Sequence, residues 1–190
     1  MLGIKSNAAE EFVKAGINVR ACRVNKRGHI EQAMSFPPFE FKQLINEDWE
    51  TSSFRARLET SRFFFVVFRE DHEGMWRLDR CLFWAMPANE IEGPAKACWD
   101  ETQKVIREGV ELNPYRDSSG KLKVANNLPG MADNPIVHVR PHTSKAAYRF
   151  ADGTEIGDIA RNAYELPDGR WMTRQSFWFN KGYLEHILGL

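Results

Sequence analysis

The chain has 190 residues, of which 43% are hydrophobic and 12% aromatic, enough for one substantial core in one domain. Its 26 basic and 26 acidic residues cancel, so net charge gives no support for a nucleic-acid partner, and any basic surface must be local. No apolar run approaches the length that spans a bilayer, which indicates a cytoplasmic protein without a membrane partner. The scattered Cys22, Cys81 and Cys98 form no disulfide or zinc pattern, and we expect them to be reduced core residues.

The first half of the chain predicts strands and helices in alternation. One or two helical turns are expected over 8–15, and β-branched residues predict a strand over 17–24. Asn25-Lys26-Arg27-Gly28 is typical of a hairpin turn, followed by a return strand from about 29 to 36 that ends at Pro37-Pro38. Apolar positions at helical spacing then predict one amphipathic helix from Phe39 through Trp49.

The middle of the chain predicts the centre of a sheet. The runs at 62–68 and 81–86 are apolar without alternation, which is typical of strands covered on both faces. We expect them to form a central hairpin, with the first run in the middle of the sheet. Asn89 is predicted to cap a helix that continues to Gly109.

The last third predicts two strands between irregular segments. Residues 111–135 are expected to form a long loop with a small hairpin around Gly120. A strand is predicted from Ile136 to about Thr143, and an irregular stretch from 150 to 169. A further strand, or strand plus turn, is predicted over 170–179, and a short helix over 183–188.

The strand that begins at Ile136 carries His138, Arg140 and His142 at alternate positions, so all three are expected on one face. Such a set suits a metal site, an acid–base pair, or a surface that binds phosphates and base edges. Four residues of strand span roughly 13 Å, against a His–metal bond of about 2 Å, which argues against one shared ion. His138 suits a half-buried structural ring equally well, and Arg140 suits a structural ion pair.

Other catalytic patterns are absent from the sequence. It has no Gly-x-Ser-x-Gly motif, no Gly-rich phosphate loop and no helical His pair flanked by Glu, which argues against a hydrolase triad. The aromatic stretch 171–179 contains Thr173, Arg174 and Gln175. Arginine and glutamine are residue types that contact guanine and adenine edges or phosphates.

Several blocks of the sequence together resemble a known family. They are Met34-Ser35-Phe36, Phe39-Glu40-Phe41-Lys42, Asn46-Glu47-Asp48-Trp49-Glu50, 62–68, Gly93-Pro94 with Trp99-Asp100, 138–143 and 171–180. In this order they resemble the restriction-endonuclease family that joins the mismatch-repair nicking enzyme MutH to GATC-cutting type II enzymes of the Sau kind. They are most similar to its C-terminal, noncatalytic MutH-like copy. The resemblance implies an α/β (α+β) fold, a restriction-endonuclease-like mixed β-sheet flanked by helices, in one domain over 1–190 that is a C-terminal fragment of a longer bacterial enzyme.

The resemblance also implies a vestigial catalytic site. Family nucleases hold Mg²⁺ with an Asp and the Glu of a Glu-x-Lys motif, and these positions carry Glu11, Asn18 and Arg20 here. A neutral amide binds a hard cation weakly, and arginine does not replace lysine in geometry or proton exchange. We therefore expect no metal cofactor in this domain and Mg²⁺ in the parent enzyme. Glu10, Glu11 or Glu31 as a substitute ligand keeps open the alternative of an active Mg²⁺-dependent GATC endonuclease.

The resemblance implies double-stranded DNA with a GATC-like site as the partner. Carried over residue by residue, the DNA-binding positions are Arg140, His142 and Thr143, supported by Lys145, Arg174 and Gln175, with backbone contacts from Lys26 and Arg27. Further expected partners are the catalytic domain of the same parent chain, on which this domain acts as an allosteric effector, and a second copy in a homodimer on DNA. A purely structural domain without DNA contact is the remaining interpretation.

Overall fold

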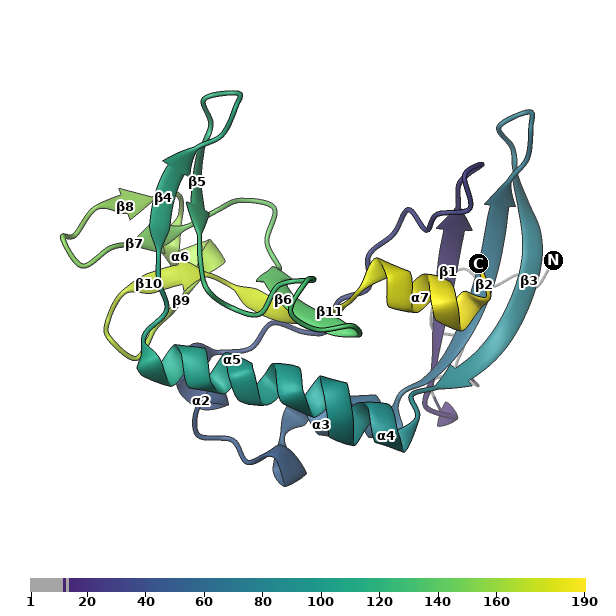
Figure 1. Ribbon diagram of the computed structural model, residues 1–190, viewed down its shortest axis with the longest axis horizontal. Coiled ribbons are helices and arrows are strands. Elements are labelled where there is room, and N and C mark those ends of the chain that lie inside the picture. The colour runs from purple at the N-terminus through teal and green to yellow at the C-terminus, as the bar shows by residue number, and fades with distance from the viewer. Residues whose placement is uncertain (1–11, 13) are drawn as a thin grey trace.

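The computed structural model describes residues 12 and 14–190 of the chain. Figure 1 shows two lobes above a long helix, α5 (Lys96–Glu108), which runs beneath the space between them. One lobe carries strands β1 to β3, and the other carries the small sheets built from β4, β5 and β7 to β10. A ribbon of β6 and β11, continued by helix α7, lies between the lobes. Within the described part of the chain, no helix is long and apolar enough to cross a membrane.

The first lobe is built on a mixed sheet of three strands in the order β1–β2–β3. β1 (Ile17–Val24) runs parallel to β2 (Arg62–Glu70), which pairs in antiparallel fashion with β3 (Trp76–Ala85). This confirms the predicted first strand, the central position of β2 and its hairpin with β3. Alternate residues Phe63, Phe65 and Val67 are buried on the inner face of β2.

The expectation that both apolar strands are covered on both faces is wrong. Phe83 of β3 is 65% exposed, and Cys81, expected in the core, is exposed as well. Most side chains of β3 are exposed in the described structure, so this strand is not covered on both faces. The other two cysteines are buried, and burial raises the pKa of the Cys98 thiol to about 12. The helical turns expected over 8–15 fall largely outside the described residues.

The turn after β1 is confirmed, but the return strand is not. Gly28 adopts a φ of +84°, which an L side chain rarely takes, and its N–H donates to the carbonyl of Asn25 at 2.9 Å. Beyond it, residues 29–36 make only isolated bridges, to β1 at Ile30 and to β11 at Ser35. The segment is not a strand because it divides its pairing between two sheets.

The single amphipathic helix expected from Phe39 through Trp49 is broken in the structure. It consists of α2 (Phe41–Leu44), a 3-10 turn η1 (Trp49–Thr51) and α3 (Ser53–Thr60). The break follows from side chains that take the carbonyl acceptors of α2: Asn46 donates to Lys42 O at 2.7 Å, and Gln103 of α5 donates to Leu44 O at 2.6 Å. Ser52 caps α3 by accepting from Arg55 N at 3.2 Å.

The helix predicted from Asn89 to Gly109 is present with an irregular start. It comprises α4 (Ala88–Glu90), a π-helical turn η2 (Ile91–Ala95) and α5. Pro94 lies inside the π turn, where its missing N–H interrupts regular α pairing. Pro87, not Asn89, is the N-cap, and no side chain caps this end. Gly109, with φ +108°, ends the helix as predicted.

The second lobe contains short strands in small sheets. The hairpin predicted around Gly120 is β4 (Asn113–Arg116) with β5 (Leu122–Ala125). The stretch 150–169, expected to be irregular, instead contributes β8 (Glu155–Ile156), α6 (Ile159–Asn162) and β9 (Ala163–Glu165). With β7 (Tyr148–Arg149) and β10 (Trp171–Thr173), these strands form a sheet in the order β8–β7–β10–β9.

The ribbon between the lobes consists of β6 (Val137–Pro141) and β11 (Gln175–Phe179) in antiparallel pairing. Strand β10 and strand β11 replace the single strand expected over 170–179, with Arg174 at the break, which agrees with the strand-plus-turn alternative. The predicted C-terminal helix is α7 (Lys181–Leu188).

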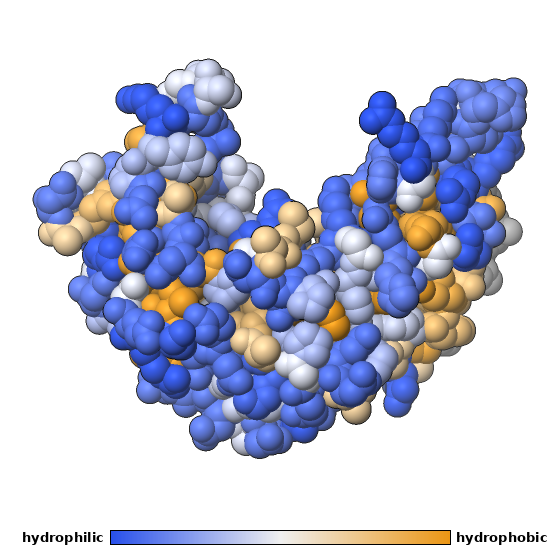
Figure 2. All heavy atoms as spheres, in the orientation of Figure 1, coloured by the Kyte–Doolittle hydropathy of each residue, from blue (hydrophilic) through white to orange (hydrophobic). Residues whose placement is uncertain are grey.

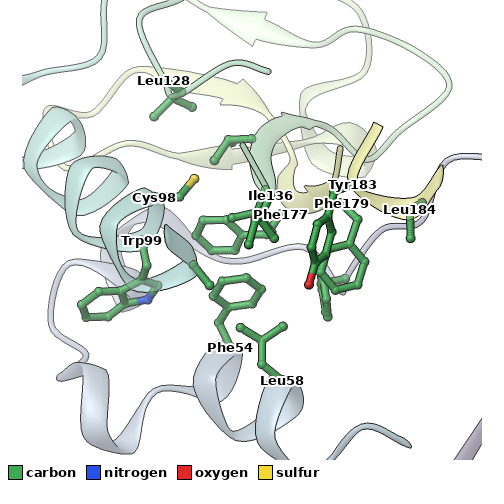
Figure 3. Close-up of a cluster of buried hydrophobic side chains, with 14 of the residues drawn as sticks. Phe54, Leu58, Cys98, Trp99, Leu128, Ile136, Phe177, Phe179, Tyr183 and Leu184 are labelled. Atoms are coloured by element: carbon green, nitrogen blue, oxygen red, sulfur yellow. The ribbon is translucent and has the colours of Figure 1, made fainter. Parts of the chain in front are cut away.

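Figure 3 shows side chains of the ribbon among those of α3, α5 and α7, and the buried cluster to which they belong extends into both lobes. Phe177 of β11 stacks on Phe54 of α3 with ring centroids 4.1 Å apart, and Phe179 lies 5.6 Å from Tyr183 of α7. Phe36, from the segment that crosses between sheets, lies 5.0 Å from Phe179. One continuous core therefore supports a single α+β domain, as expected. The described strands form four sheets, however, and not the one mixed sheet expected, because most strands after β3 are too short to extend it.

Candidate nucleic-acid interface

The β6–β11 ribbon presents the predicted polar residues on one face. In its register, His138 lies opposite Trp178 and Arg140 lies opposite Ser176. Pairing continues past the ribbon, because His142 N donates to Arg174 O at 2.9 Å. The alternation of His138, Arg140 and His142 therefore confirms the predicted common face, which runs from the core to the surface.

His138 is the buried end of this face. Its Nδ1–H donates to Asn180 Oδ1 at 2.6 Å, and the Asn180 amide nitrogen donates to Asn134 O at 2.6 Å, which fixes the orientation of the Asn180 carboxamide. Burial lowers the pKa of His138, a shift that the bond to Asn180 opposes and nearby Arg140 reinforces. His138 is therefore a neutral structural ring, the alternative that its sequence context left open.

His142 and Arg140 lie nearer the surface. Nδ1 of His142 lies 2.8 Å from Ser176 Oγ, so the two histidine rings have different partners. The Arg140 guanidinium lies 4.6 Å from the ring centroid of Trp178, whose indole N–H donates to the Arg140 carbonyl at 3.2 Å. The aromatic ring positions the Arg140 side chain without neutralising its charge.

An open pocket of about 550 Å³ adjoins this face and brings four predicted residues together. They are His142, Thr143, Lys145 and Arg174. The Thr143 hydroxyl donates to Lys145 O at 2.6 Å, which shapes the loop after β6. The Arg174 guanidinium lies 4.6 Å from the ring centroid of Tyr164, and its Nε is buried without a hydrogen-bond partner in the described structure. An unsatisfied buried donor beside an open pocket favours a ligand with acceptor atoms.

Two further polar residues of the pocket, Arg161 and Asn162, were not predicted. They belong to α6, in the stretch expected to be irregular. Asp158 caps this helix by accepting from Arg161 N at 3.1 Å, so the Asp158-x-x-Arg161 spacing was the sequence signal that could have revealed it. These residues belong to the site only because α6 packs beside Arg174, whose N–H donates to the carbonyl of Asn162 at 2.9 Å.

The interface carries local positive charge in a chain without net charge. Within the described structure, no ion pair is formed by Arg140, Lys145, Arg161 or Arg174. Nearby Arg149 and Arg170, by contrast, pair with Glu155 and Asp168 at 2.6 Å. Three of these cations line the pocket together with one carboxylate, Asp158, and Arg140 lies on the adjoining ribbon face. The excess of positive charge creates a surface that attracts anions.

The remaining predicted DNA-binding residues lie elsewhere. Gln175 is only 1% exposed and its amide donates to Thr173 O at 2.9 Å, so we leave it out of the interface. Lys26 and Arg27 lie at the tip of β1 in the other lobe, where the Lys26 ammonium donates to His72 O at 3.2 Å. Figure 2 shows a wide hollow between the two lobes, with mostly hydrophilic residues on both arms.

The predicted vestigial catalytic positions also adjoin a pocket. Asn18 and Arg20 share the inner face of β1 with buried Cys22 and help to line a pocket of about 160 Å³. Its described lining contains no carboxylate, and Glu31 is not part of it. Glu11 lies outside the described residues. Because Mg²⁺ prefers carboxylate and water oxygens, this donor set does not fit the metal that the family resemblance implies.

The sequence of the chain has a match among the type II restriction enzymes. It is similar to the type II restriction enzyme Sau3AI of Staphylococcus aureus, with 37% identity over 189 residues that cover 93% of this chain. The chain spans 39% of the length of that relative. This similarity confirms the resemblance to restriction enzymes of the Sau kind that the sequence motifs predict. No family model matches the chain.

Proposed function

We propose that this chain is a double-stranded-DNA-binding domain of a type II restriction enzyme, specific for a GATC-like site, that binds DNA without cutting it. The observation that carries the proposal is a set of four cations without ion pairs in the described structure. Lys145, Arg161 and Arg174 line one open pocket, and Arg140 lies on the adjoining ribbon face. Phosphates supply the negative charge and the acceptor oxygens that such a cluster lacks.

The four cations differ in the contacts they are suited to make. Arg140 lies on the ribbon face, where a fork of donors held over Trp178 can contact a guanine edge. Lys145, Arg161 and Arg174 line the pocket and suit backbone phosphates. In the turn after β1, exposed Arg27 and its neighbour Lys26 are positioned for further backbone contacts.

The absence of cutting is supported by the donor set at β1. Asn18 and Arg20 occupy the positions where the family resemblance places a carboxylate and a lysine, and the described pocket lining adds Arg57 but no acidic group. A second, catalytic domain of a parent enzyme would then hold Mg²⁺ and cleave. The chain spans 39% of the length of Sau3AI, which leaves room in a protein of that size for such a domain. Binding here would act allosterically on that domain, in the bacterial cytoplasm, with a homodimer on DNA as one arrangement.

The proposal is tested by titrating the chain with matched GATC and scrambled duplexes at several salt concentrations. We expect tighter binding to the GATC duplex and affinity that falls steeply with salt. Arg140→Ala should weaken GATC binding by about 1–3 kcal/mol if Arg140 contacts a base, and weaken both duplexes equally if it contacts a phosphate.

Glu101→Ala, on the exposed side of α5, serves as the matched control because it changes the net charge by one unit away from the interface. Binding that is absent, or that is independent of salt, would leave the chain as a structural domain. Unchanged affinity of Arg140→Ala for both duplexes would remove Arg140 from the interface.

A further inference from the structure

The pocket at the former catalytic position has a lining suited to an anion. It forms where β1, the segment 34–37 and the end of α3 meet, with Asn18 and Arg20 from β1 and Arg57 from α3. Ser35 and Ser61 add hydroxyl groups, and the buried Phe36 and Phe63 contribute apolar surface. Every charged side chain in this described lining is an arginine.

Both arginines are uncompensated within the described structure. Neither the Arg20 nor the Arg57 guanidinium forms an ion pair or a hydrogen bond there. Arg55, two residues before Arg57 on the same helix, pairs with Glu50, Glu59 and Glu92. Acidic residues therefore surround Arg55, and none pairs with Arg57, which lines the pocket.

We propose that this pocket binds a phosphate group directly, through Arg20 and Arg57, without a metal ion. Guanidinium groups bind phosphate oxygens in a bidentate fork and keep their charge at any physiological pH. The apolar surface of Phe36 and Phe63 lowers the local dielectric and strengthens this attraction. The substitutions that remove metal affinity from the family's catalytic position thus convert it into an anion site.

The position of the pocket connects it to the interface described above. Segment 34–37 lines the pocket and also borders β11, because Phe36 N donates to Phe177 O at 2.9 Å and Ser35 bridges to Trp178. The ring of Trp178 in turn lies beneath the Arg140 guanidinium. The phosphate pocket and the Arg140 face therefore lie on opposite edges of one strand, so a single duplex can supply phosphates to both.

The phosphate could come from DNA or from free phosphate in solution, and two measurements distinguish the sources. The DNA measurement rests on the proposed function, whereas the measurement with inorganic phosphate does not. Both use the whole chain in EDTA, with Arg20→Ala, Arg57→Ala and the double variant. Arg62→Ala is the matched control, because Arg62 is an exposed arginine of the same sheet on the face opposite Arg20.

In the DNA measurement, log affinity is plotted against log salt concentration. The slope of this plot is negative, and we expect it to become shallower by about one unit in the arginine variants, equally for GATC and scrambled duplexes. In Arg62→Ala the slope should stay unchanged. Arg20 and Arg57 are exposed, so circular dichroism should show folded variants, and the single variants suffice if the double variant unfolds.

In the phosphate measurement, the thermal midpoint is compared in inorganic phosphate and in chloride at equal ionic strength. We expect phosphate to raise the midpoint of the wild type and of Arg62→Ala, and to raise it less in the arginine variants. A positive phosphate result with unchanged DNA slopes identifies free phosphate as the ligand. If the arginine variants match the wild type in both measurements, the inference is overturned, whether or not the chain binds DNA through Arg140.

Discussion

Strands β6 and β1 both change from buried to exposed residues along one face, but their buried ends differ in polarity. In each strand alternate residues run from the core to the surface: His138 and Arg140 in β6, and Val24, Cys22 and Arg20 in β1. In β6 the buried end is polar and satisfied by Asn180, whereas in β1 the buried end is apolar.

The comparison shows which residues of each strand can change without loss of packing and are therefore available for binding. The buried ends define the packing, since changing them leaves a cavity or an unsatisfied group. The surface ends carry arginines without ion pairs in the described structure. Strand β6 pairs directly with β11, and segment 34–37, which lines the Arg20 pocket, borders the other edge of β11. The Arg140 face and the segment that lines the Arg20 pocket therefore flank the same strand.

The largest expected effect comes from breaking the link between α3 and β11. Phe177 is 2% exposed and stacks on Phe54, which lies three residues before Arg57. We expect Phe177→Ala to lower the free energy of unfolding by about 3–5 kcal/mol in urea denaturation, because it leaves a cavity in the shared core. Phe83→Ala, at an aromatic residue that is 65% exposed, should change it by less than about 0.5 kcal/mol. Equal losses for the two variants would contradict this account of the core.

A smaller effect is expected from removing the ring beneath Arg140. Trp178→Leu should weaken DNA binding by about 0.5–1 kcal/mol, because the guanidinium loses a cation–π contact that positions it. Trp171→Leu is the matched control: Arg149 lies over Trp171 at 5.5 Å but is already paired with Glu155. Fluorescence anisotropy with a labelled duplex measures both variants. If both bind DNA equally well, Trp178 has no positioning role.

The smallest expected effect concerns the buried end of β6. Burial lowers the pKa of His138 below its ordinary 6.5, so the unfolded chain binds this proton more readily than the folded chain. The contribution of His138 to stability is therefore fully present above pH 6.5 and is lost as the pH falls through the lowered pKa.

Urea denaturation between about pH 7.5 and 5 measures this loss. We expect His138→Gln, which keeps a donor for Asn180, to show a shallower decrease in stability as the pH falls. The exposed His72, changed to Gln, should leave the wild-type pH dependence in place. A His138→Gln profile that follows the wild type would assign the pH dependence to other groups.

The sequence predicted those parts of the fold that local patterns determine. Strands β1 and β2, the hairpin around Gly120 and helix α7 were predicted because alternation, turn residues and helical spacing act over a few neighbours. The single helix through Trp49 was not, because Gln103 from a distant helix takes the carbonyl of Leu44.

The candidate site was predictable only in part for the same reason. Arg140, His142, Thr143 and Lys145 lie close together in the sequence and could be recognised there as a basic segment. Arg161 and Arg57 join their pockets only through tertiary contacts of α6 and α3. The orientation of the Gln175 side chain was not predicted, because the strand is interrupted at Arg174. The interruption places Arg174 in the pocket and Gln175 in the core.

The central claim, that the chain binds DNA without cutting it, is tested most directly on supercoiled plasmid that contains GATC sites. The chain is incubated with the plasmid in Mg²⁺ or Mn²⁺, and binding and cleavage are read from the same gel. We predict plasmid that is retarded but remains supercoiled. Nicked or linear plasmid whose formation disappears on Glu11→Ala would contradict the account and identify the chain as a metal-dependent nuclease.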